Sequence, residues 1–424
     1  MIRRYLEQLG GNRTVMAVSI ARLGDAIGNS ILFIVIPIYV AKLPADIFKL
    51  PETVKVGILI ATFGLITALL QPFMGAFSDW VGKRKIFILG GLILMFISSL
   101  GFIFAVQFFD LLILRFIQAI GVALTVPAAV ALLASSSKKH SRGGSMGIYT
   151  TFRMLGLAIG PLLGGFVYER KGFNVAFIVG AGFILVGVLL VQFWVKDLPS
   201  EKPQKQKNPQ KPFRIFDTSI LSPGLLGAGL ASLVMAASFS MITTLENQFN
   251  ARLSQTAFAF GLAFSSLTIS RMITQIPLGR WSDIIGRKPL IITGLIFMMP
   301  ATIILGYVTS TLQLSLARIV QGMASACVAA PAFAVAADLS SGGNVGRKMS
   351  IITVSFGLGI GLGPLLSGIL AVHSFQLPFL VIGSLNLLAA VFVWIFLPET
   401  APQKTGDAEP SQYLKTNREF RESE

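Results

Sequence analysis

Long apolar stretches alternate with short polar segments along the whole chain. With a window of about 19 residues, the stretches number about twelve, and each is long enough to cross a bilayer as a helix. None shows the period-two alternation of a membrane barrel strand. Because backbone groups in lipid must be hydrogen-bonded internally, the pattern predicts an all-α membrane protein. The expected spans are residues 14–41, 56–78, 86–106, 109–134, 144–167, 174–195, 221–245, 256–279, 289–309, 312–337, 347–371 and 377–397.

The composition excludes an ordinary soluble protein. Hydrophobic residues make up 54% of the 424 residues and charged residues only 13%, whereas a soluble domain carries about 25% charged residues. The single Cys327 excludes an intramolecular disulfide, and His140 and His373 lie too far apart for metal-ligand spacing. We therefore expect no cofactor and no metal. No GxxxxGK[ST] motif is present, so energy has to come from a gradient rather than from ATP.

Basic residues are distributed unequally between alternate loops. The N-terminus, the tail and every second loop together hold 24 Lys and Arg residues, whereas the other loops hold six. Because positive side chains resist translocation, we expect both termini in the cytoplasm and a multi-pass protein of the plasma membrane. The formal net charge of +16 then reflects topology, and its expected partner is the anionic inner leaflet rather than nucleic acid.

The longest polar segment divides the chain into two sets of six expected spans. Residues 197–220 are rich in Lys, Pro and Gln, a composition typical of a flexible linker. The expected organisation is a six-helix bundle at 1–196, this cytoplasmic linker, a second bundle at 221–397 and a cytoplasmic tail at 398–424. We expect the chain to act as a monomer.

Three motifs recur at nearly one offset. GAFSDWVGKRK from residue 75 returns as GRWSDIIGRKP from residue 279, LRFIQAIG from 114 returns as ARIVQGMA from 317, and AIGPLLGG from 158 returns as GLGPLLSG from 361. Such self-similarity indicates an internal duplication. Because the offset covers an even number of spans, the two copies are expected to be parallel, with a solute path between them.

These motifs resemble those of the major facilitator superfamily. GxxxDxxGKRK follows the second expected span, RxxQ lies in the fourth, and GxxxGPxxGG in the fifth is similar to the antiporter signature of that family. The opening LGDAIGNSILFIVIPIY resembles the first helix of twelve-helix drug:proton antiporters, which include multidrug and tetracycline exporters. The resemblance implies twelve helices in two pseudo-symmetric bundles that transport solutes by alternating access.

The resemblance also implies a conformational latch at the cytoplasmic ends of the second and eighth spans. In the family, the Asp of this motif contacts the eleventh helix and holds the cytoplasmic side shut. A topogenic loop with a capping Asp is the simpler alternative. Trp80 stands where the family usually has a base, and Ala134 stands where it often has an acid, so the latch is expected to be weaker in the first copy. The latch residues are Gly75, Asp79, Gly82, Lys83, Arg84, Asp283, Gly286, Arg287 and Asp338.

Small residues at four-residue spacing mark the fifth span and its repeat. They allow helix backbones to approach closely, and the prolines bend the helices. Helix packing alone would account for them, whereas the resemblance implies a helix that seals the interface between the halves. These residues are Gly156, Gly160, Pro161, Gly164, Gly165, Gly363 and Pro364.

Ionisable side chains inside a span cost about 2.5 to 3.5 kcal/mol each, so each one suggests a function. Asp25 is the only acid well inside an expected span, and Arg22 lies on the same helical face. The pair could carry a coupled proton, or it could be a static ion pair that helps the helix insert. Arg115 is the arginine that the family resemblance links to proton coupling, and we expect it to face Asp25 across the cavity.

The internal repeat separates the remaining arginines. Arg318 repeats Arg115, whereas Arg153 and Arg271 occur in one copy only, so the fold alone does not require them. They could contact substrate, or they could snorkel or bond to another helix. The residues expected to line a substrate cavity are Arg22, Asn29, Gln118, Arg153, Arg271 and Gln275.

The favoured function is proton-coupled efflux of amphipathic or hydrophobic small molecules. One alternative is an uptake symporter or facilitator for an anionic organic metabolite, suggested by five arginines within spans against one deep acid. A second is a transport-inactive sensor with the same fold. An enzyme is not expected, because no nucleophile, base and orienting group recur at a recognisable spacing.

Overall fold

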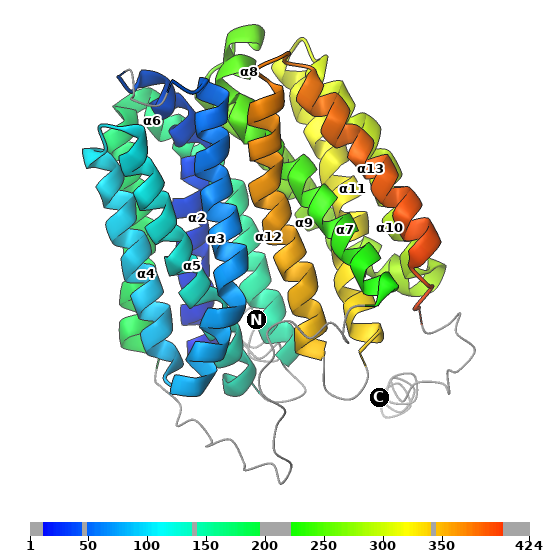
Figure 1. Cartoon of the computed structure of the whole chain (residues 1–424). Helices are drawn as coiled ribbons and strands as arrows, with labels where there is room; N and C mark the ends of the chain where they lie inside the picture. Colours follow the sequence, from blue (N-terminus) through cyan, green and yellow to red (C-terminus); the bar gives the residue numbers. More distant parts are fainter. Residues whose placement is uncertain (1–11, 45–48, 138–141, 196–221, 341–344, 402–424) are drawn as a thin grey trace, which may run out of the picture.

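The fold is helical throughout the part of the chain that the structure describes. The computed structural model describes residues 12–44, 49–137, 142–195, 222–340 and 345–401 (Figure 1). The expected linker at 197–220 and the tail beyond residue 401 lie outside these ranges. The helices are α2 (Arg13–Lys42), α3 (Glu52–Val81), α4 (Arg84–Gly101), η1 (Phe102–Phe104), α5 (Phe108–Ser136), α6 (Arg142–Trp194), α7 (Pro223–Ser240), η4 (Met241–Leu245), α8 (Glu246–Leu253), α9 (Ala257–Ile285), α10 (Arg287–Ile303), η5 (Ile304–Gly306), α11 (Thr311–Asp338), α12 (Val345–Leu370) and α13 (Leu377–Phe396).

Eleven helices in the described ranges are long and apolar enough to cross a membrane, and one of them crosses twice. Helix α6 is interrupted at Gly172, whose φ of 80° and ψ of −175° lie outside the helical region. A side chain disfavours this backbone conformation, so glycine permits the chain to turn back there. The two legs of α6 correspond to the expected spans 144–167 and 174–195, and the prediction of about twelve spans is confirmed.

Several helices extend beyond the apolar stretches that predicted them. Helix α3 begins at Glu52 rather than near residue 56, and α9 continues to Ile285 rather than ending near 279. Capping residues set the helix starts: the Asn12 side chain accepts a 2.8 Å hydrogen bond from the Val15 amide, and Thr256 does the same for Ala259. Hydropathy marks the bilayer-facing length, whereas caps and turns determine where a helix ends.

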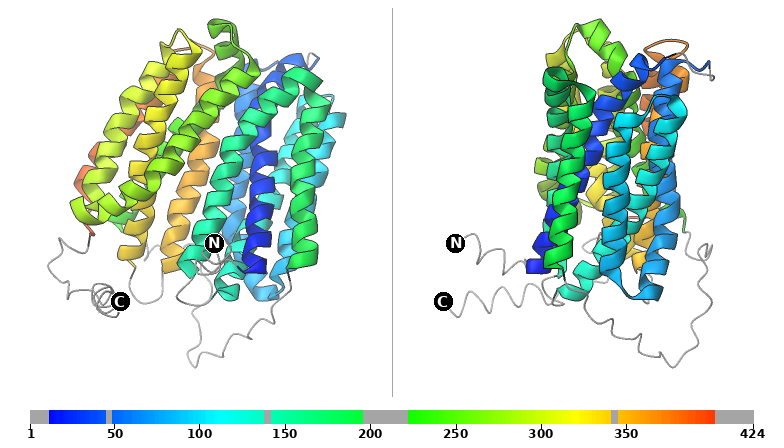
Figure 2. Two further views of the ribbon diagram at one scale, coloured as in Figure 1. Left: turned by 180° about the vertical axis from the view of Figure 1, so that it is seen from behind. Right: turned by 90° about the vertical axis from the view of Figure 1, so that its left-hand side faces the viewer.

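The helices form two groups that lie side by side. Helices α2–α6 make up the N-terminal half and α7–α13 the C-terminal half, and the halves lean apart toward one end (Figure 2). Helix α2 begins and α13 ends at that same end, which we call the terminal end. The opposite end, which carries α8, is called the far end.

A large apolar cluster joins the halves at the far end. One buried cluster contains residues of both halves, including Phe33 and Ile60 from the first and Leu245 and Phe264 from the second. Toward the terminal end, each half has a separate cluster of its own. Because burial of apolar surface holds packed elements together, this conformation is closed at the far end, with two independent cores at the terminal end.

Candidate functional site

The halves meet along two symmetry-related helix pairs, α3 with α12 and α6 with α9. A methyl group at Gly57 on α3 would lie 2.8 Å from the carbonyl oxygen of Pro364. In the other pair, a methyl group at Gly261 on α9 would lie 2.5 Å from the carbonyl oxygen of Pro161. The duplicated sequence therefore places a glycine against the proline of the opposite half twice.

Only part of the expected interface set lies between the halves. Pro161, Gly165 and Pro364 face the opposite half, whereas Gly363 packs on α7 in its own half. The remaining three glycines pack within the N-terminal half. Residues at four-residue spacing share one helical face, and this face of α6 contacts α2. These glycines are Gly156, Gly160 and Gly164, which approach Ala26, Ser30 and Ile31.

The Gly261→Ala substitution is expected to open the far end. Its new methyl group would overlap the Pro161 carbonyl, and overpacking of this kind costs about 1 to 3 kcal/mol. In a Cys327→Ser background, Thr53→Cys reports the opening, because Thr53 is 8% exposed and bonds across the closed far end to Gly368. Labelling by a membrane-impermeant thiol reagent should become about tenfold faster.

The matched control is Gly182→Ala on the second leg of α6. A methyl group there meets no atom within 4 Å, so its labelling rate should equal that of the parent. If Gly261→Ala labels at the parent rate, the proline contact does not hold the far end closed.

A buried polar group lies in the middle of α2. Asp25 is 1% exposed and forms an ion pair with Arg22, one turn earlier on the helix. Asn29 donates a 2.8 Å hydrogen bond from its Nδ2 to the Asp25 Oδ1. Three expected site residues are thus in direct contact, and the Arg22 guanidinium also lies 5.9 Å from the ring centroid of Tyr149 on α6.

The expectation that Arg115 faces Asp25 is wrong in this conformation. Arg115 is fully buried, and its Nη1 donates to the Gln118 Oε1 at 3.0 Å. The Gln118 Nε2 in turn donates to the Ser99 Oγ at 3.3 Å, on α4. The direction in which a helical side chain points depends on helix rotation, which hydropathy does not specify. Gln118 therefore lies in a helix-packing network rather than against the Asp25 group.

The same network is repeated in the C-terminal half. Arg318 donates to Gln321 at 2.8 Å, and Gln321 donates to Thr302 at 2.9 Å. Arg318 also donates to the Phe239 carbonyl at 3.2 Å, whereas the Nη2 of Arg115 has no hydrogen-bond partner among the described residues. The two arginines share a scaffold, and Arg115 keeps more unused donor capacity.

Two arginines from opposite halves approach the Asp25 group. Arg153 on α6 lies within electrostatic range of Arg22, Asp25, Tyr149 and Arg271, the last of which is on α9. Arg271 is 8% exposed, and its guanidinium lies 5.7 Å from the Phe356 ring centroid. Arg153 is thus close both to the Arg22–Asp25 pair and to Arg271 of the other half.

Gln275, the remaining expected cavity residue, is half-buried one turn beyond Arg271 on α9. Its position on the same helical face places it toward the terminal end of the arginine group. The fold thus brings Arg22, Asp25, Asn29, Arg153 and Arg271 together, with Gln275 adjacent and Gln118 apart.

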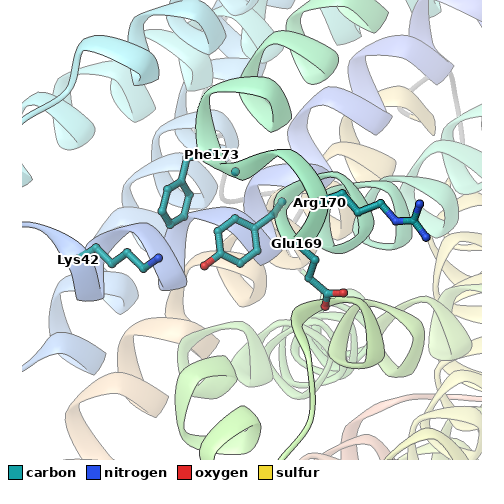
Figure 3. A pocket seen from close by; sticks show the side chains of 6 residues that line it. Lys42, Glu169, Arg170 and Phe173 are labelled. Atoms are coloured by element: carbon teal, nitrogen blue, oxygen red, sulfur yellow. The ribbon is translucent and has the colours of Figure 1, made fainter.

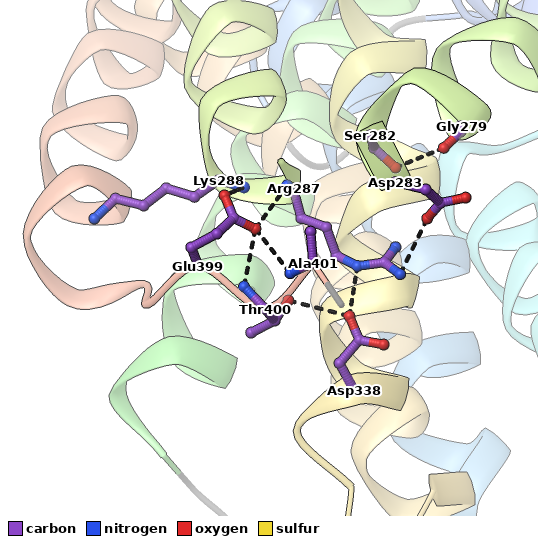
Figure 4. A network of polar contacts seen from close by, with 9 residues as sticks. All are labelled: Gly279, Ser282, Asp283, Arg287, Lys288, Asp338, Glu399, Thr400 and Ala401. Atoms are coloured by element: carbon purple, nitrogen blue, oxygen red, sulfur yellow. Dashed lines mark hydrogen bonds and ion pairs between the residues drawn. The ribbon is translucent and has the colours of Figure 1, made fainter. Parts of the chain in front are cut away.

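The latch residues of the C-terminal half form a compact cluster (Figure 4). Arg287 pairs with Asp283 at 3.1 Å and with Asp338 on α11 at 2.5 Å, and only 9% of its side chain is exposed. Gly286 has a φ of 112°, which turns the chain between α9 and α10. This cluster fixes the α9–α10 turn to the end of α11.

Sequence reasoning missed Glu399, which completes this cluster. Its carboxylate accepts hydrogen bonds from the backbone amides of Arg287 at 2.9 Å and Lys288 at 3.3 Å (Figure 4). A carboxylate at a helix N-terminus satisfies free amides and compensates the helix dipole, so Glu399 caps α10. Thr400 donates to the Asp338 Oδ2 at 3.1 Å. The signal in the sequence was an acid directly after the last apolar stretch.

The latch of the N-terminal half is looser. Asp79 pairs with Arg84 at 3.5 Å, and 64% of its side chain is exposed. Arg84 also donates, from its Nη1, to the Ala131 carbonyl at 2.8 Å. Gly82 has the expected positive φ of 72°, and Lys83 is exposed at the start of α4. The corresponding position of Asp338 is Ala134, so the first copy lacks the acid that would complete a cluster.

Gly75, one of the expected latch residues, lies away from the turn between α3 and α4. It lies inside α3, where a methyl group would be 3.3 Å from the Cβ of Pro127 on α5. Helix α3 continues to Val81, so the turn begins only at Gly82. The role of Gly75 is therefore close packing between α3 and α5.

A small cavity of about 470 Å³ lies at the far end, beside the turn of α6 (Figure 3). The Lys42 ammonium lies 5.0 Å from the ring centroid of Phe173, and Glu169 accepts a 2.6 Å hydrogen bond from the Phe258 amide across the halves. Both charged groups thus have structural partners, and the cavity contains none of the expected site residues. Its lining is Lys42, Tyr168, Glu169, Arg170, Gly172 and Phe173.

Two repeated sets of membrane-length helices with buried charged side chains define a multi-pass helical membrane protein. The sequence profile described as Major Facilitator Superfamily matches residues 18–267 and 224–422. The chain belongs to the Major Facilitator Superfamily, as the motifs predicted. Proteins of this family are transporters and not enzymes, so the chain is a multi-pass membrane transporter of small molecules.

Known relatives are similar over most of the chain. The multi-drug resistance efflux pump PmrA of Streptococcus pneumoniae serotype 4 is 26% identical over 313 residues, which cover 73% of this chain and 77% of that protein. The multidrug resistance protein MdtG of Escherichia coli O6:K15:H31 is 26% identical over 352 residues, covering 80% and 83%. A bacterial homolog of the human lysosomal transporter Spinster, solved in an inward-facing and occupied conformation, has the same fold, with a TM-score of 0.72, 16% identity, and coverage of 90% and 95%.

Proposed function

We propose that this protein is a proton-coupled exporter of amphipathic or hydrophobic small molecules that works by alternating access. The observation that carries the proposal is the buried Arg22–Asp25 pair, which lies near Arg153, together with the apolar cluster that joins the two halves at the far end. A titratable group at such a seam can be reached from one side at a time as the halves rock. The similarity to proteins named multidrug efflux pumps supports the outward direction.

The distribution of basic residues supports an orientation with the terminal end in the cytoplasm of a plasma membrane. In that orientation the closed far end faces the outside of the cell. The bundles at 1–196 and 221–397 would be the moving bodies, with basic loops at the anionic inner leaflet. One chain contains both bodies, so a monomer suffices.

Coupling follows from the charge balance around Asp25. When Asp25 is ionised, it neutralises Arg22 and offers a carboxylate to a hydrogen-bond donor or a cation on the solute. When Asp25 is protonated, the pair is lost and three guanidinium groups remain, so a neutral or cationic solute is released. Proton and solute would then exclude one another, which is the condition for antiport.

The excess of arginines favours a second candidate function, proton symport of an anionic organic solute. Arg153 and Arg271 have no carboxylate counterpart among the described residues. Protonation of Asp25 would increase the positive charge of the group and strengthen anion binding. Proton and solute would then move in the same direction, and the sign of proton movement distinguishes the two functions.

The test uses purified protein in liposomes that enclose a pH indicator. An outward solute gradient is imposed for each member of a panel of cationic, neutral and anionic amphiphiles, without a pH gradient. Antiport moves protons against the solute flux, and symport moves them with it. Solute flux without proton movement would refute coupling, and ligand binding without any flux would identify a transport-inactive sensor.

A further inference from the structure

The first residue of α8 is a carboxylic acid that solvent does not reach. Glu246 is 0% exposed, and both of its carboxyl oxygens are buried. The neutral Asn250 side chain, one turn further along α8, is close enough to donate a hydrogen bond to this carboxyl group. From its place next to a loop, Glu246 would be expected at an exposed rim, so the burial comes from tertiary packing.

No charged group of the neighbouring elements compensates a carboxylate at this position. Helix α8 packs against α2, η4 and α9, is bonded to α3, and touches the segment before α13. Segment η4 has no titratable side chain, and α9 has none before Arg271. The titratable groups of the other elements are exposed or half-buried: Tyr39, Lys42, Glu52, Lys55, Arg252 and His373.

These groups also have contacts elsewhere. Tyr39 donates to the Ala105 carbonyl at 2.6 Å, and Lys42 lies over Phe173. Lys55 lies over Phe108 and Arg252 over Phe375, with the cations 5.9 Å and 4.3 Å from the ring centroids. Burying an ionised carboxylate without a charged partner costs several kcal/mol, so burial in this conformation favours the neutral acid.

Glu246 is buried by the same contacts that close the far end. The adjacent Asn247 donates from its Nδ2 to the Pro37 carbonyl on α2 at 2.8 Å and to the Glu52 Oε1 on α3 at 2.5 Å. On either side, Leu245 and Phe249 belong to the apolar cluster shared by both halves. Separating the halves at the far end would break these contacts and admit water to the carboxyl group.

The contacts of Leu245, Asn247 and Phe249 with the other half are called the far-end seal. We propose that Glu246 is a proton-binding group of this seal, distinct from the Asp25 group. The seal closes over the neutral acid and opens with the ionised one, so closing takes up one proton from the far side. This inference rests on the alternating access of the proposed function. One proton taken up on closing means that the ratio of closed to open protein rises up to about tenfold for each unit by which the pH falls.

The distance between two spin labels in nanodiscs measures this ratio without solute or gradient. Leu50→Cys and Ala251→Cys, introduced together in a Cys327→Ser background, place labels on exposed far-end positions of the two halves. A short distance between the labels reports a closed far end. In the parent, the population with the short distance should grow as the pH is lowered. Glu246→Gln, a neutral mimic of the protonated acid, should remain closed across the whole pH range, and so should Glu246→Met.

Glu52→Gln is the matched control, since it removes an acid from the same seal and keeps an oxygen that can accept from Asn247. It should retain the pH response of the parent. A pH response that persists in both Glu246→Gln and Glu246→Met, or a parent that shows none, would overturn the proposal. Because no transport is measured, a failure here leaves the exporter proposal intact. Solute flux without proton movement in the liposome test would refute the proposed coupling and leave the pH dependence of the label distance unaffected, so the two failures are distinguishable.

Discussion

Asp25→Asn should abolish the accumulation of solute that a pH gradient drives. For each coupled proton, a gradient of one pH unit can hold a solute about tenfold away from equilibrium. Without an ionisable group at position 25, that ratio should fall to one, while solute exchange without a gradient continues. The measurement is the steady-state solute ratio in liposomes of the parent and the variant.

Stability has to be controlled in this experiment. Asp25→Asn removes the counter-charge of Arg22, which is 9% exposed, and breaking a buried pair costs about 3 to 5 kcal/mol. The double variant Arg22→Gln, Asp25→Asn contains no unpaired charge, so it should recover most of the thermal stability without recovering accumulation. If Asp25→Asn still concentrates solute as the parent does, another group carries the coupled proton.

Arg287→Met should destabilise the terminal end of the C-terminal half. Arg287 joins α10 to Asp283 and to Asp338, and its loss leaves two acids facing one another. Because the side chain of Asp283 is 58% exposed, solvent screens part of the effect, and we expect a loss of about 1 to 3 kcal/mol. Thermal unfolding in nanodiscs measures the loss, and a slower transport cycle should accompany it.

The internal repeat supplies the control. Lys83 occupies the position of Arg287 in the first copy but is exposed, so Lys83→Met should change the unfolding free energy by less than about 0.5 kcal/mol. Equal effects of the two substitutions would show that the ion pairs of Arg287 contribute nothing beyond a surface charge. The comparison measures the joint contribution of the Arg287 ion pairs with Asp283 and Asp338.

The sequence alone predicted the number and kind of the helices and the family. Hydropathy was sufficient for this, because lipid forces every spanning segment to satisfy its own backbone hydrogen bonds. The three repeated motifs were sufficient for the family, because each contains glycine, proline or charge at positions where a turn, a close approach or an ion pair leaves few other choices. Asp25 and Arg22 were also predicted as a pair, since three residues along a helix place them on one face.

Contacts between distant segments required the tertiary structure. Arg115 was expected to face Asp25, yet the face of α5 that carries Arg115 and Gln118 is turned toward Ser99 on α4, and hydropathy does not specify that rotation. Gly156 and Gly165 lie on one helix but face α2 and α9 respectively. Glu399 reaches the start of α10 only because the segment after α13 folds back onto it.

The sequence by itself determined the features that are local or periodic along the chain. These are about twelve crossings, two repeated halves, and the residues able to bear charge inside the bilayer. What only the tertiary structure decided is which end is closed and which charges have partners. The far-end seal depends on apolar residues from both halves, and the burial of Glu246 depends on that seal. The cost of burying a charge depends on everything packed around it, and no single segment of sequence contains those neighbours.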